Sequence, residues 1–308
     1  MRGAASTALL AILLLAGCSG AKTRPPHVAG AAVSPGRSAV SHGTTGGGGT
    51  TGSIHDDLNR PQSSRYSDNS DSVPGTVPDV SKLVEPVPKV EPRSLYGNKS
   101  PYTVLGKTYR VLPSARGYDE RGIASFYGNK FHGYKTSSLE TYDMYAFSAA
   151  STTLPLPSYA RVTNLENGKS VIVRVNDRGP FHANRLIDLS YAAAVKIGIW
   201  PKGTGLVEVR GIDPGNPAQE LPSPRVVRAG HPGIYLQVGA FSDTDNAERL
   251  AQRLRQAKLG DVQILDAQVN GRHVHRVRVG PLADVEQADQ VSARIEAMGL
   301  PSPQVAVD

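Results

Sequence analysis

Short runs of alternating apolar and polar residues fill the chain between residues 93 and 213. Three β-branched runs with a period of two cover residues 159–165, 169–177 and 205–212, and Asn, Gly and Pro separate them. Such runs are typical of half-buried strands. An Asn-Gly pair at residues 167–168 predicts a tight hairpin between the first two runs, because both residue types tolerate a positive φ.

One helix is expected among these strands, at residues 189–198. Ser190 stands near its start and Gly198 near its end, as suits an N-cap and a C-cap. Several short strands with a single helix, in roughly a hundred residues, predict a small β-barrel. The first domain is therefore expected to be mainly β and to cover residues 93–213, including an ordered lead-in.

Residues 231–308 follow a different pattern, in which strands alternate with amphipathic helices. Residues 235–241 and 272–282 alternate as strands do, whereas residues 246–260 and 286–299 carry apolar residues at helical spacing. The order strand, helix, strand occurs twice, which is a split βαβ, ferredoxin-like layout. The second domain is therefore expected to be α+β.

Linker-like composition surrounds the two domains. Residues 1–17 combine a basic start with an apolar run too short to span a bilayer, which indicates a signal peptide. Residues 18–92 are rich in Gly, Ser and Pro and predict a long, disordered tether. Residues 214–230 are Pro-rich and predict a shorter linker between the domains. A length of 308 residues fits two domains.

The only cysteine of the chain, Cys18, follows the residues Leu-Ala-Gly. A lone cysteine cannot form an internal disulfide. The sequence "LAGC" resembles the lipobox of bacterial lipoproteins, which implies cleavage before Cys18 and its acylation; several acyl chains would hold a protein firmly on a membrane. Ser19 in place of aspartate then implies the outer membrane, facing the periplasm. The alternative is a chance cysteine after an ordinary signal peptide.

The net charge of +7 and the pI near 9.5 suit an anionic partner. For an exported chain we expect cell wall or lipid rather than nucleic acid, with weak, salt-sensitive steering. RNA-binding modules share the strand order of the second domain, but they read RNA with paired aromatic residues, and the strands here offer mainly Arg, His and Val. The sequence shows no metal cluster, phosphate loop or nucleophile-base pair, so no cofactor and no metal are expected.

Two dense motifs carry a family resemblance. "RVNDRGPF" at residues 174–181, followed by "RLIDLS" at residues 185–190, resembles the double-psi β-barrel of the rare lipoprotein A family, septal lytic transglycosylases of Gram-negative bacteria. "LQVGAF" and "VRVGP" in the second domain resemble a SPOR domain, which binds septal peptidoglycan without stem peptides. Expansins use the same barrel, so the fold alone does not settle the function.

The resemblance implies a lyase that cuts the β-1,4 bond between N-acetylmuramic acid and N-acetylglucosamine. The 6-hydroxyl of the muramic sugar attacks its own carbon 1 and leaves a 1,6-anhydro end. One group that protonates the leaving oxygen and then deprotonates the 6-hydroxyl can suffice, if its pKa is raised. Asp177 falls on the catalytic aspartate of the family and Glu140 on its catalytic glutamate. Without the resemblance, Asp177 would be a turn cap paired with Arg178, and Glu140 a solvated charge.

Three positions near these carboxylates depart from the family. Ser151 stands where the family has an active-site histidine, Leu139 where glycine is usual, and Phe126 where tryptophan is usual. Serine cannot shuttle a proton near pH 7. Two interpretations stay open: the histidine is dispensable, or the protein only binds septal glycan. Asp188 is expected to be structural, as the ion-pair partner of Arg185 or as a helix cap.

Substrate contacts are expected in both domains. Aromatic rings stack on sugar faces. One face of the sheet can present its arginines together with His273 and His275 to glycan, although core packing and a solvated sheet face are the alternatives. Partners of the septal machinery, or amidases that strip stem peptides, would act with such a protein. The expected substrate-binding residues are Phe126, Tyr127, His132, Ser151 and Arg178 in the barrel, and Gln237, Arg276 and Arg278 in the SPOR sheet.

Overall fold

The computed structural model divides the chain into a unit Met1–Thr51 and a compact unit Gly52–Asp308. The signal peptide, Cys18 and most of the inter-domain linker lie outside the described residues. Within the part of the chain that the structure describes, no helix has both the length and the apolar character needed to cross a membrane. The described residues are 56–57, 60, 62–182, 184–216, 233–269 and 271–307.

Residues 62–100, here called the N-terminal strap, lie along the barrel. The strap holds a short helix α1 (Gln62–Arg65) and a 3-10 turn η1 (Val80–Lys82). Asp71 accepts hydrogen bonds from the backbone N–H of Gly128 at 2.7 Å and of Lys130 at 3.1 Å. This part of the expected tether is therefore bound to the barrel through specific contacts that its composition does not reveal. A small hairpin of β1 (Tyr102–Val104) and β2 (Lys107–Tyr109) follows.

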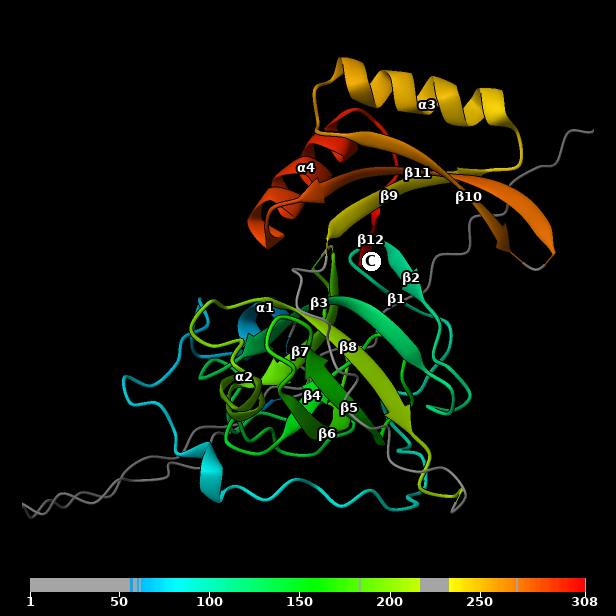
Figure 1. Cartoon of the computed structure of the whole chain (residues 1–308). Coiled ribbons are helices and arrows are strands. Elements are labelled where there is room, and N and C mark those ends of the chain that lie inside the picture. The colour runs from blue at the N-terminus through cyan, green and yellow to red at the C-terminus, as the bar shows by residue number, and fades with distance from the viewer. Residues whose placement is uncertain are drawn as a thin grey trace, which may run out of the picture. The chain divides into compact units, whose positions relative to one another are not determined.

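Six strands close into a barrel in the order β3-β7-β4-β6-β5-β8 (Figure 1). The pairs β3–β7 and β4–β6 are parallel, and the other neighbours are antiparallel. The closed barrel confirms the mainly-β prediction for the first domain. The strands are β3 (Asp119–Tyr127), β4 (Ser148–Ala150), β5 (Ser158–Asn164), β6 (Ser170–Asp177), β7 (Arg185–Ser190) and β8 (Gly205–Ile212).

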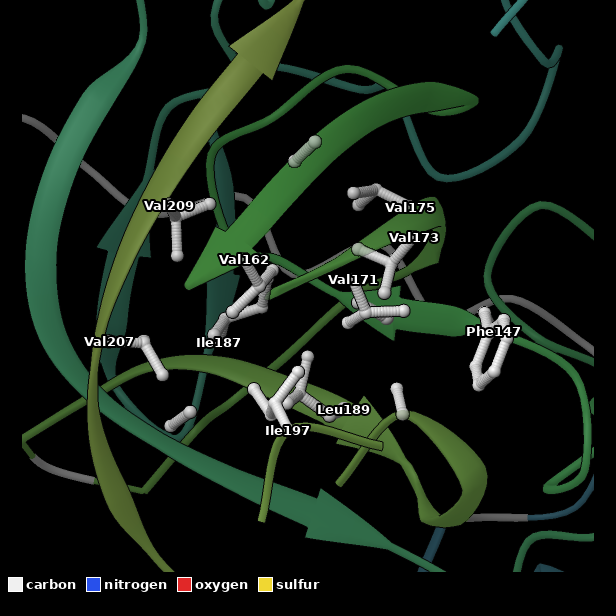
Figure 2. Close-up of a cluster of buried hydrophobic side chains, with 14 of the residues drawn as sticks. Phe147, Val162, Val171, Val173, Val175, Ile187, Leu189, Ile197, Val207 and Val209 are labelled. Atoms are coloured by element: carbon white, nitrogen blue, oxygen red, sulfur yellow. The ribbon is translucent and has the colours of Figure 1, made fainter. Parts of the chain in front are cut away.

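The barrel interior is filled by branched aliphatic side chains, many of them valines (Figure 2). On β6, Val171, Val173 and Val175 are fully buried there, because alternate residues of a strand point to the same side. Ile172, on the opposite side of β6, joins a separate small cluster with Tyr159 and Ile212. The alternation along β6 therefore assigns odd-numbered residues to the interior of the barrel.

Helix α2 (Tyr191–Ile197) covers part of the barrel core. Its N-cap is Ser190, whose hydroxyl accepts from the N–H of Ala193 at 3.3 Å. Gly198 ends the helix in the left-handed conformation, with φ of 76°, which glycine adopts without steric cost. The predicted helix and both of its caps are confirmed.

The second domain is a four-stranded antiparallel sheet in the order β10-β11-β9-β12 with two helices. Leu236, Val277 and Val279 are buried in a core with helix residues such as Leu254 and Ile295, so one face of the sheet is covered by the helices. The predicted α+β layout is confirmed. The elements are β9 (Ile234–Phe241), α3 (Thr244–Gln256), β10 (Val262–Val269), β11 (Arg272–Leu282), α4 (Val285–Ala297) and β12 (Gln304–Val307).

Candidate active site

Asp177 is the last residue of β6 and lies on the same side of that strand as Val171, Val173 and Val175. Gly179, with φ of 145°, turns the chain away directly after it. The carboxylate therefore lies at the mouth of the apolar barrel interior. Part of the residue remains exposed, yet protein atoms surround the carboxylate closely. Burial raises the pKa of Asp177 above its ordinary value, although hydrogen bonds from Ser137 and the Arg178 N–H act in the opposite direction.

Three hydrogen-bond donors meet at one oxygen of this carboxylate. Asp177 Oδ1 accepts from the backbone N–H of Ser137 at 2.8 Å, from the Ser137 hydroxyl at 2.7 Å and from the N–H of Arg178 at 2.7 Å. A proton on the carboxyl group would therefore sit on Oδ2. The three donors stabilise the anion, whereas burial favours the neutral acid. Such a group can give up a proton and recover it.

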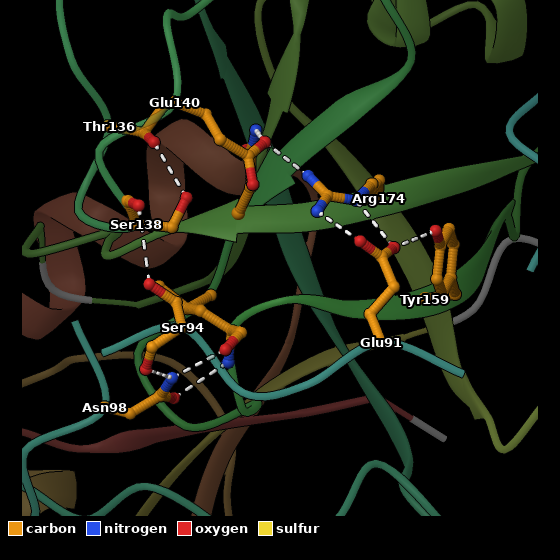
Figure 3. Close-up of polar contacts among 10 residues, drawn as sticks. Glu91, Ser94, Asn98, Thr136, Ser138, Glu140, Tyr159 and Arg174 are labelled. Carbon is orange, nitrogen blue, oxygen red and sulfur yellow. Dashed lines mark hydrogen bonds and ion pairs between the residues drawn. The ribbon is translucent and has the colours of Figure 1, made fainter. Parts of the chain in front are cut away.

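Glu140 lies in a network on the other side of β6 (Figure 3). Its Oε2 accepts from the guanidinium of Arg174 and, at 2.9 Å, from Asn176 Nδ2. Arg174 also donates to Glu91 of the strap, at 2.9 and 3.1 Å. Burial alone would raise the pKa of Glu140, but the bonds and charge of Arg174 and the bond from Asn176 outweigh it and lower the pKa. Glu140 is therefore a carboxylate at neutral pH.

Leu139, next to Glu140, adopts a left-handed backbone conformation with φ of 67°. Glycine reaches this region freely, whereas a residue with a Cβ loses roughly 1–2 kcal/mol there. The position at which the family usually has glycine is thus one where glycine fits the backbone best. Leu139 keeps this turn at an energetic cost, and its side chain is half-buried.

Asp188 on β7 is a second buried carboxyl group near Asp177. It accepts a hydrogen bond from the Ser125 hydroxyl, and a Cβ added at Gly179 would lie 3.5 Å from its Oδ2. Burial raises the pKa of Asp188, and the charge of Asp177 raises it further. Because Ser190 caps α2, the helix-cap interpretation of Asp188 is wrong. The sequence does not show that Asp177 and Asp188 lie close together. The pairing of β7 with β3 and β4 brings Asp188 to this position.

Ser151 closes a turn beside Asp177. It is 2% exposed, and its hydroxyl accepts from the N–H groups of Thr153 at 3.3 Å and Leu154 at 3.1 Å. Its own N–H donates to the Asp177 carbonyl at 3.0 Å. The hydroxyl is thus used by the backbone, and contact of Ser151 with substrate stays a prediction.

Arg178 does not form the carboxylate pair considered as the alternative for Asp177. Its guanidinium donates to the carbonyls of Gly97, Ser151 and Leu154 at 2.6 to 2.8 Å. Burial lowers the pKa of Arg178 to about 10, but the group stays protonated at neutral pH. Arg178 therefore ties the strap at Gly97 to the turn at Ser151 and Leu154, next to Asp177.

The aromatic candidates divide into packed and exposed rings. Phe126 packs against Tyr191 and Trp200, and Tyr127 is buried and stacked on Tyr142 with ring centroids 4.1 Å apart. Core packing accounts for both rings. The His132 side chain is 42% exposed, and its ring meets the exposed Tyr145 edge-on at 5.7 Å. Tyr145, which the sequence did not single out, offers a surface ring beside His132.

The SPOR sheet places its polar candidates on the face away from the helices. Gln237 pairs with Arg278, and Arg276 pairs with Ala240. His275 lies on the other face, since its ring contacts Thr244 at the start of α3. Neighbouring residues of one strand point to opposite faces, so the arginines and the histidines of β11 cannot share one surface. The expectation that both face the glycan together is corrected.

A closed barrel with an acidic mouth, followed by an α+β sheet that carries Gln237 and Arg276 on the face away from its helices, defines a double-psi β-barrel protein with a C-terminal SPOR domain. The family models agree: "Lytic transglycolase" matches residues 119–210 and "SPOR domain" matches residues 230–306. Both domain types anticipated from the sequence are therefore confirmed.

Curated relatives cover most of the chain. "Endolytic peptidoglycan transglycosylase RlpA" of Pseudomonas aeruginosa is 41% identical over 286 residues, 75% of this chain and 83% of that protein. The protein of the same name from Vibrio cholerae is 40% identical over 238 residues, 77% of this chain and 88% of that protein. The solved structure "Crystal structure of RlpA SPOR domain from Pseudomonas aeruginosa" is 34% identical and covers 24% of this chain and 97% of that one, with a TM-score of 0.23. The chain belongs to the RlpA family of endolytic peptidoglycan transglycosylases.

Proposed function

We propose that this chain is a lytic transglycosylase that cleaves the β-1,4 bond between N-acetylmuramic acid and N-acetylglucosamine and forms 1,6-anhydro ends. The observation that carries the proposal is the raised pKa of Asp177 at the mouth of the barrel, in a chain of this family. A general acid for this reaction must hold its proton near neutral pH, and burial favours that state.

The reaction needs one group that gives and then takes a proton. Asp177 first protonates the glycosidic oxygen as the bond from that oxygen to carbon 1 breaks. The 6-hydroxyl oxygen of the muramic sugar then bonds to carbon 1, and its proton goes to Asp177. During the interval the anion is stabilised by the N–H groups of Ser137 and Arg178 and by the Ser137 hydroxyl. The acid is regenerated and no water is consumed.

Glu140 receives a supporting role in this mechanism. Its bond to Arg174 keeps it ionised, so it has no proton to donate at neutral pH. A fixed negative charge stabilises the positive charge that develops on the sugar ring in an oxocarbenium-like transition state. The pKa of Asp188 is raised by burial and by the charge of Asp177. The carboxyl pair of Asp177 and Asp188 therefore holds a proton more readily than an isolated carboxyl group does.

The cellular setting is part of the proposal and rests on sequence. A lipid anchor at Cys18 would hold the chain on the outer membrane, facing the periplasm. The SPOR face with Gln237 and Arg276 would bind glycan strands that lack stem peptides and would direct the barrel to the division septum. Amidases that strip those peptides would supply the substrate.

A second candidate function is glycan binding without cleavage. Ser151, at the position of the family histidine, has its hydroxyl bonded to two backbone N–H groups. No proton carrier therefore takes the place of that histidine at this position. Under this alternative the barrel and the SPOR domain would both bind septal peptidoglycan, and Asp177 would not take part in catalysis.

Digestion of peptide-free sacculi separates the two candidates. Purified protein is incubated with amidase-treated sacculi, and 1,6-anhydromuramic products are measured by mass spectrometry for wild type, Asp177→Asn and Ser151→His. We expect products from wild type and none from Asp177→Asn. Sacculus binding without products in the wild type would overturn the enzymatic proposal. Products from Ser151→His alone would then assign the loss of activity to that position.

A further inference from the structure

Three metal-ligating side chains meet at the outer end of the β10–β11 hairpin in the SPOR domain. One ligand atom from each of Asp266, His273 and His275 lies within 4.8 Å of the other two. Among the described residues this is the group in which three such side chains converge. The descriptions of the matched families and of the named relatives mention no metal.

The strand register explains why these residues meet. His273 and His275 are two apart on β11 and so point to the same face. Asp266 on β10 is the direct cross-strand partner of His275, which puts its side chain on that face too. The rings of the two histidines are 5.6 Å apart between centroids. An antiparallel ladder therefore presents three ligands as a triangle on a rigid support.

His275 already has the surroundings of an oriented ligand. Its Nδ1 lies 2.6 Å from Asp266 Oδ1, and its Nε2 lies 3.0 Å from the hydroxyl of Thr244, the first residue of α3. Its side chain is 17% exposed, whereas that of Asp266 is 66% exposed. Metal-bound histidines usually have their second ring nitrogen held by a polar group, as Thr244 holds this one. His273, by contrast, is exposed and stands beside this arrangement.

We propose that Asp266, His273 and His275 bind a divalent transition-metal ion, Zn²⁺ in the first place, with water as the fourth ligand. Two imidazoles and one carboxylate are a donor set that Zn²⁺ takes in open, four-coordinate sites. The ion would take the place of the hydrogen between His275 Nδ1 and Asp266 Oδ1. The neutral imidazole would keep its one ring proton on Nε2, which then donates to the Thr244 hydroxyl.

Only a small rearrangement is needed. Two tetrahedral ligands at about 2.1 Å from Zn²⁺ stand roughly 3.4 Å apart, so Asp266 Oδ1 must move back from His275 Nδ1. The largely exposed side chain of Asp266 can turn to allow this. Because β10 is the edge strand, a bound ion would fasten it to β11 at the outer end of the hairpin.

Zinc titration of the full chain tests the proposal. Every sample carries Cys18→Ser, which removes the only thiol of the chain. Zn²⁺ is titrated calorimetrically, and Co²⁺ is added separately to record the visible absorption of a four-coordinate site. We expect one ion per chain. Thr244→Ala should weaken binding about 10-fold, as loss of an outer partner does, and His273→Ala and His275→Ala should weaken it by more than about 100-fold.

Arg272→Ala is the matched control, because this residue neighbours His273 on β11 but points to the other face. It should bind Zn²⁺ as the parent does. Zn²⁺ should raise the melting temperature of the parent and of Arg272→Ala but not that of His273→Ala, whose metal-free melting temperature should match the parent. The proposal is overturned if the parent shows no saturable binding of one ion, or if His273→Ala and His275→Ala bind Zn²⁺ with the affinity of the parent.

Discussion

The two sides of strand β6 hold carboxylates whose pKa values are shifted in opposite directions. On the interior side, Asp177 ends a row of valines, and burial raises its pKa. On the outer side, Glu140 meets Arg174 and Asn176, and its pKa is lowered. The even-numbered residues Arg174 and Asn176 of β6 supply the donors to Glu140, whereas the odd-numbered Asp177 follows the buried valines. The comparison teaches that alternation along one strand gives two carboxylates different surroundings, which shift their pKa values in opposite directions.

Asp177→Asn should have the largest effect on this comparison. An amide keeps the Oδ1 acceptor for Ser137 and Arg178 but has no acidic proton, so anhydro product formation should fall by about 10²–10⁴-fold, the usual worth of general acid-base catalysis. A carboxyl group with a raised pKa costs the folded state stability once the pH is above its unfolded pKa. At pH 7 the variant should therefore unfold at the same temperature as wild type or higher. Full activity in the variant would contradict the role of Asp177.

Glu140→Gln should reduce activity less than Asp177→Asn does. The glutamine can still accept from Arg174 and Asn176, but it loses the negative charge. Because Glu140 is already ionised, it supplies charge rather than a proton, and we expect a loss of about 10-fold in kcat with KM nearly unchanged. Steady-state product formation for the two variants, run side by side, measures the difference. An equal or greater loss in Glu140→Gln would reverse the assignment of roles.

Arg65→Ala should move the pH dependence rather than the maximum rate. The positive charge of Arg65 lowers the pKa of Asp177 against the larger effect of burial. Without that charge the pKa of Asp177 rises further, so the alkaline limb of the activity profile should move to higher pH. Lys130→Ala is the control, since it removes a strap contact of the same region, the bond to the Asn69 carbonyl at 3.0 Å. A profile unchanged in Arg65→Ala would show that the strap does not influence Asp177.

Ser151→Ala should have the smallest effect, and on stability alone. Removing the hydroxyl leaves the N–H groups of Thr153 and Leu154 without their acceptor, which should lower the free energy of unfolding by about 1–2 kcal/mol. Denaturant unfolding of the variant and of Ser158→Ala, a buried serine on β5, would measure this cost. A large loss of activity in a stable Ser151→Ala protein would instead place the hydroxyl in the reaction.

The barrel, the caps of α2 and the SPOR layout are predictable from the sequence because each depends on local signals. Alternation, the Ser190 cap and the Gly198 stop are all readable within a few residues. The carboxyl pair of Asp177 and Asp188 is not predictable in this way, because it arises from the pairing of β4 with both β6 and β7, which lie many residues further along the chain. Composition predicts a tether for the strap, because it does not show that Asp71 accepts a hydrogen bond from the N–H of Gly128.

The histidine and aspartate cluster on the SPOR hairpin shows the same limit. The repeat His-x-His at His273 and His275 is readable in the sequence and, taken alone, predicts part of a glycan-binding face. The third ligand, Asp266, becomes a neighbour of His275 only through the register of β10 against β11. A prediction of that register from sequence would have placed the three ligands together.

The order in which the barrel strands pair has a consequence for how the chain reaches its native state. Strand β3 comes first in the barrel sequence, yet its neighbours are β7 and β8, the last two, and Asp119 pairs with Arg210. Closing so long a loop loses chain entropy before the contacts that reward it can form. A chain still being synthesised therefore cannot complete the barrel until β8 has emerged. Folding should be slow compared with that of a helical domain, and a chain cut before β8 should remain an open, aggregation-prone sheet.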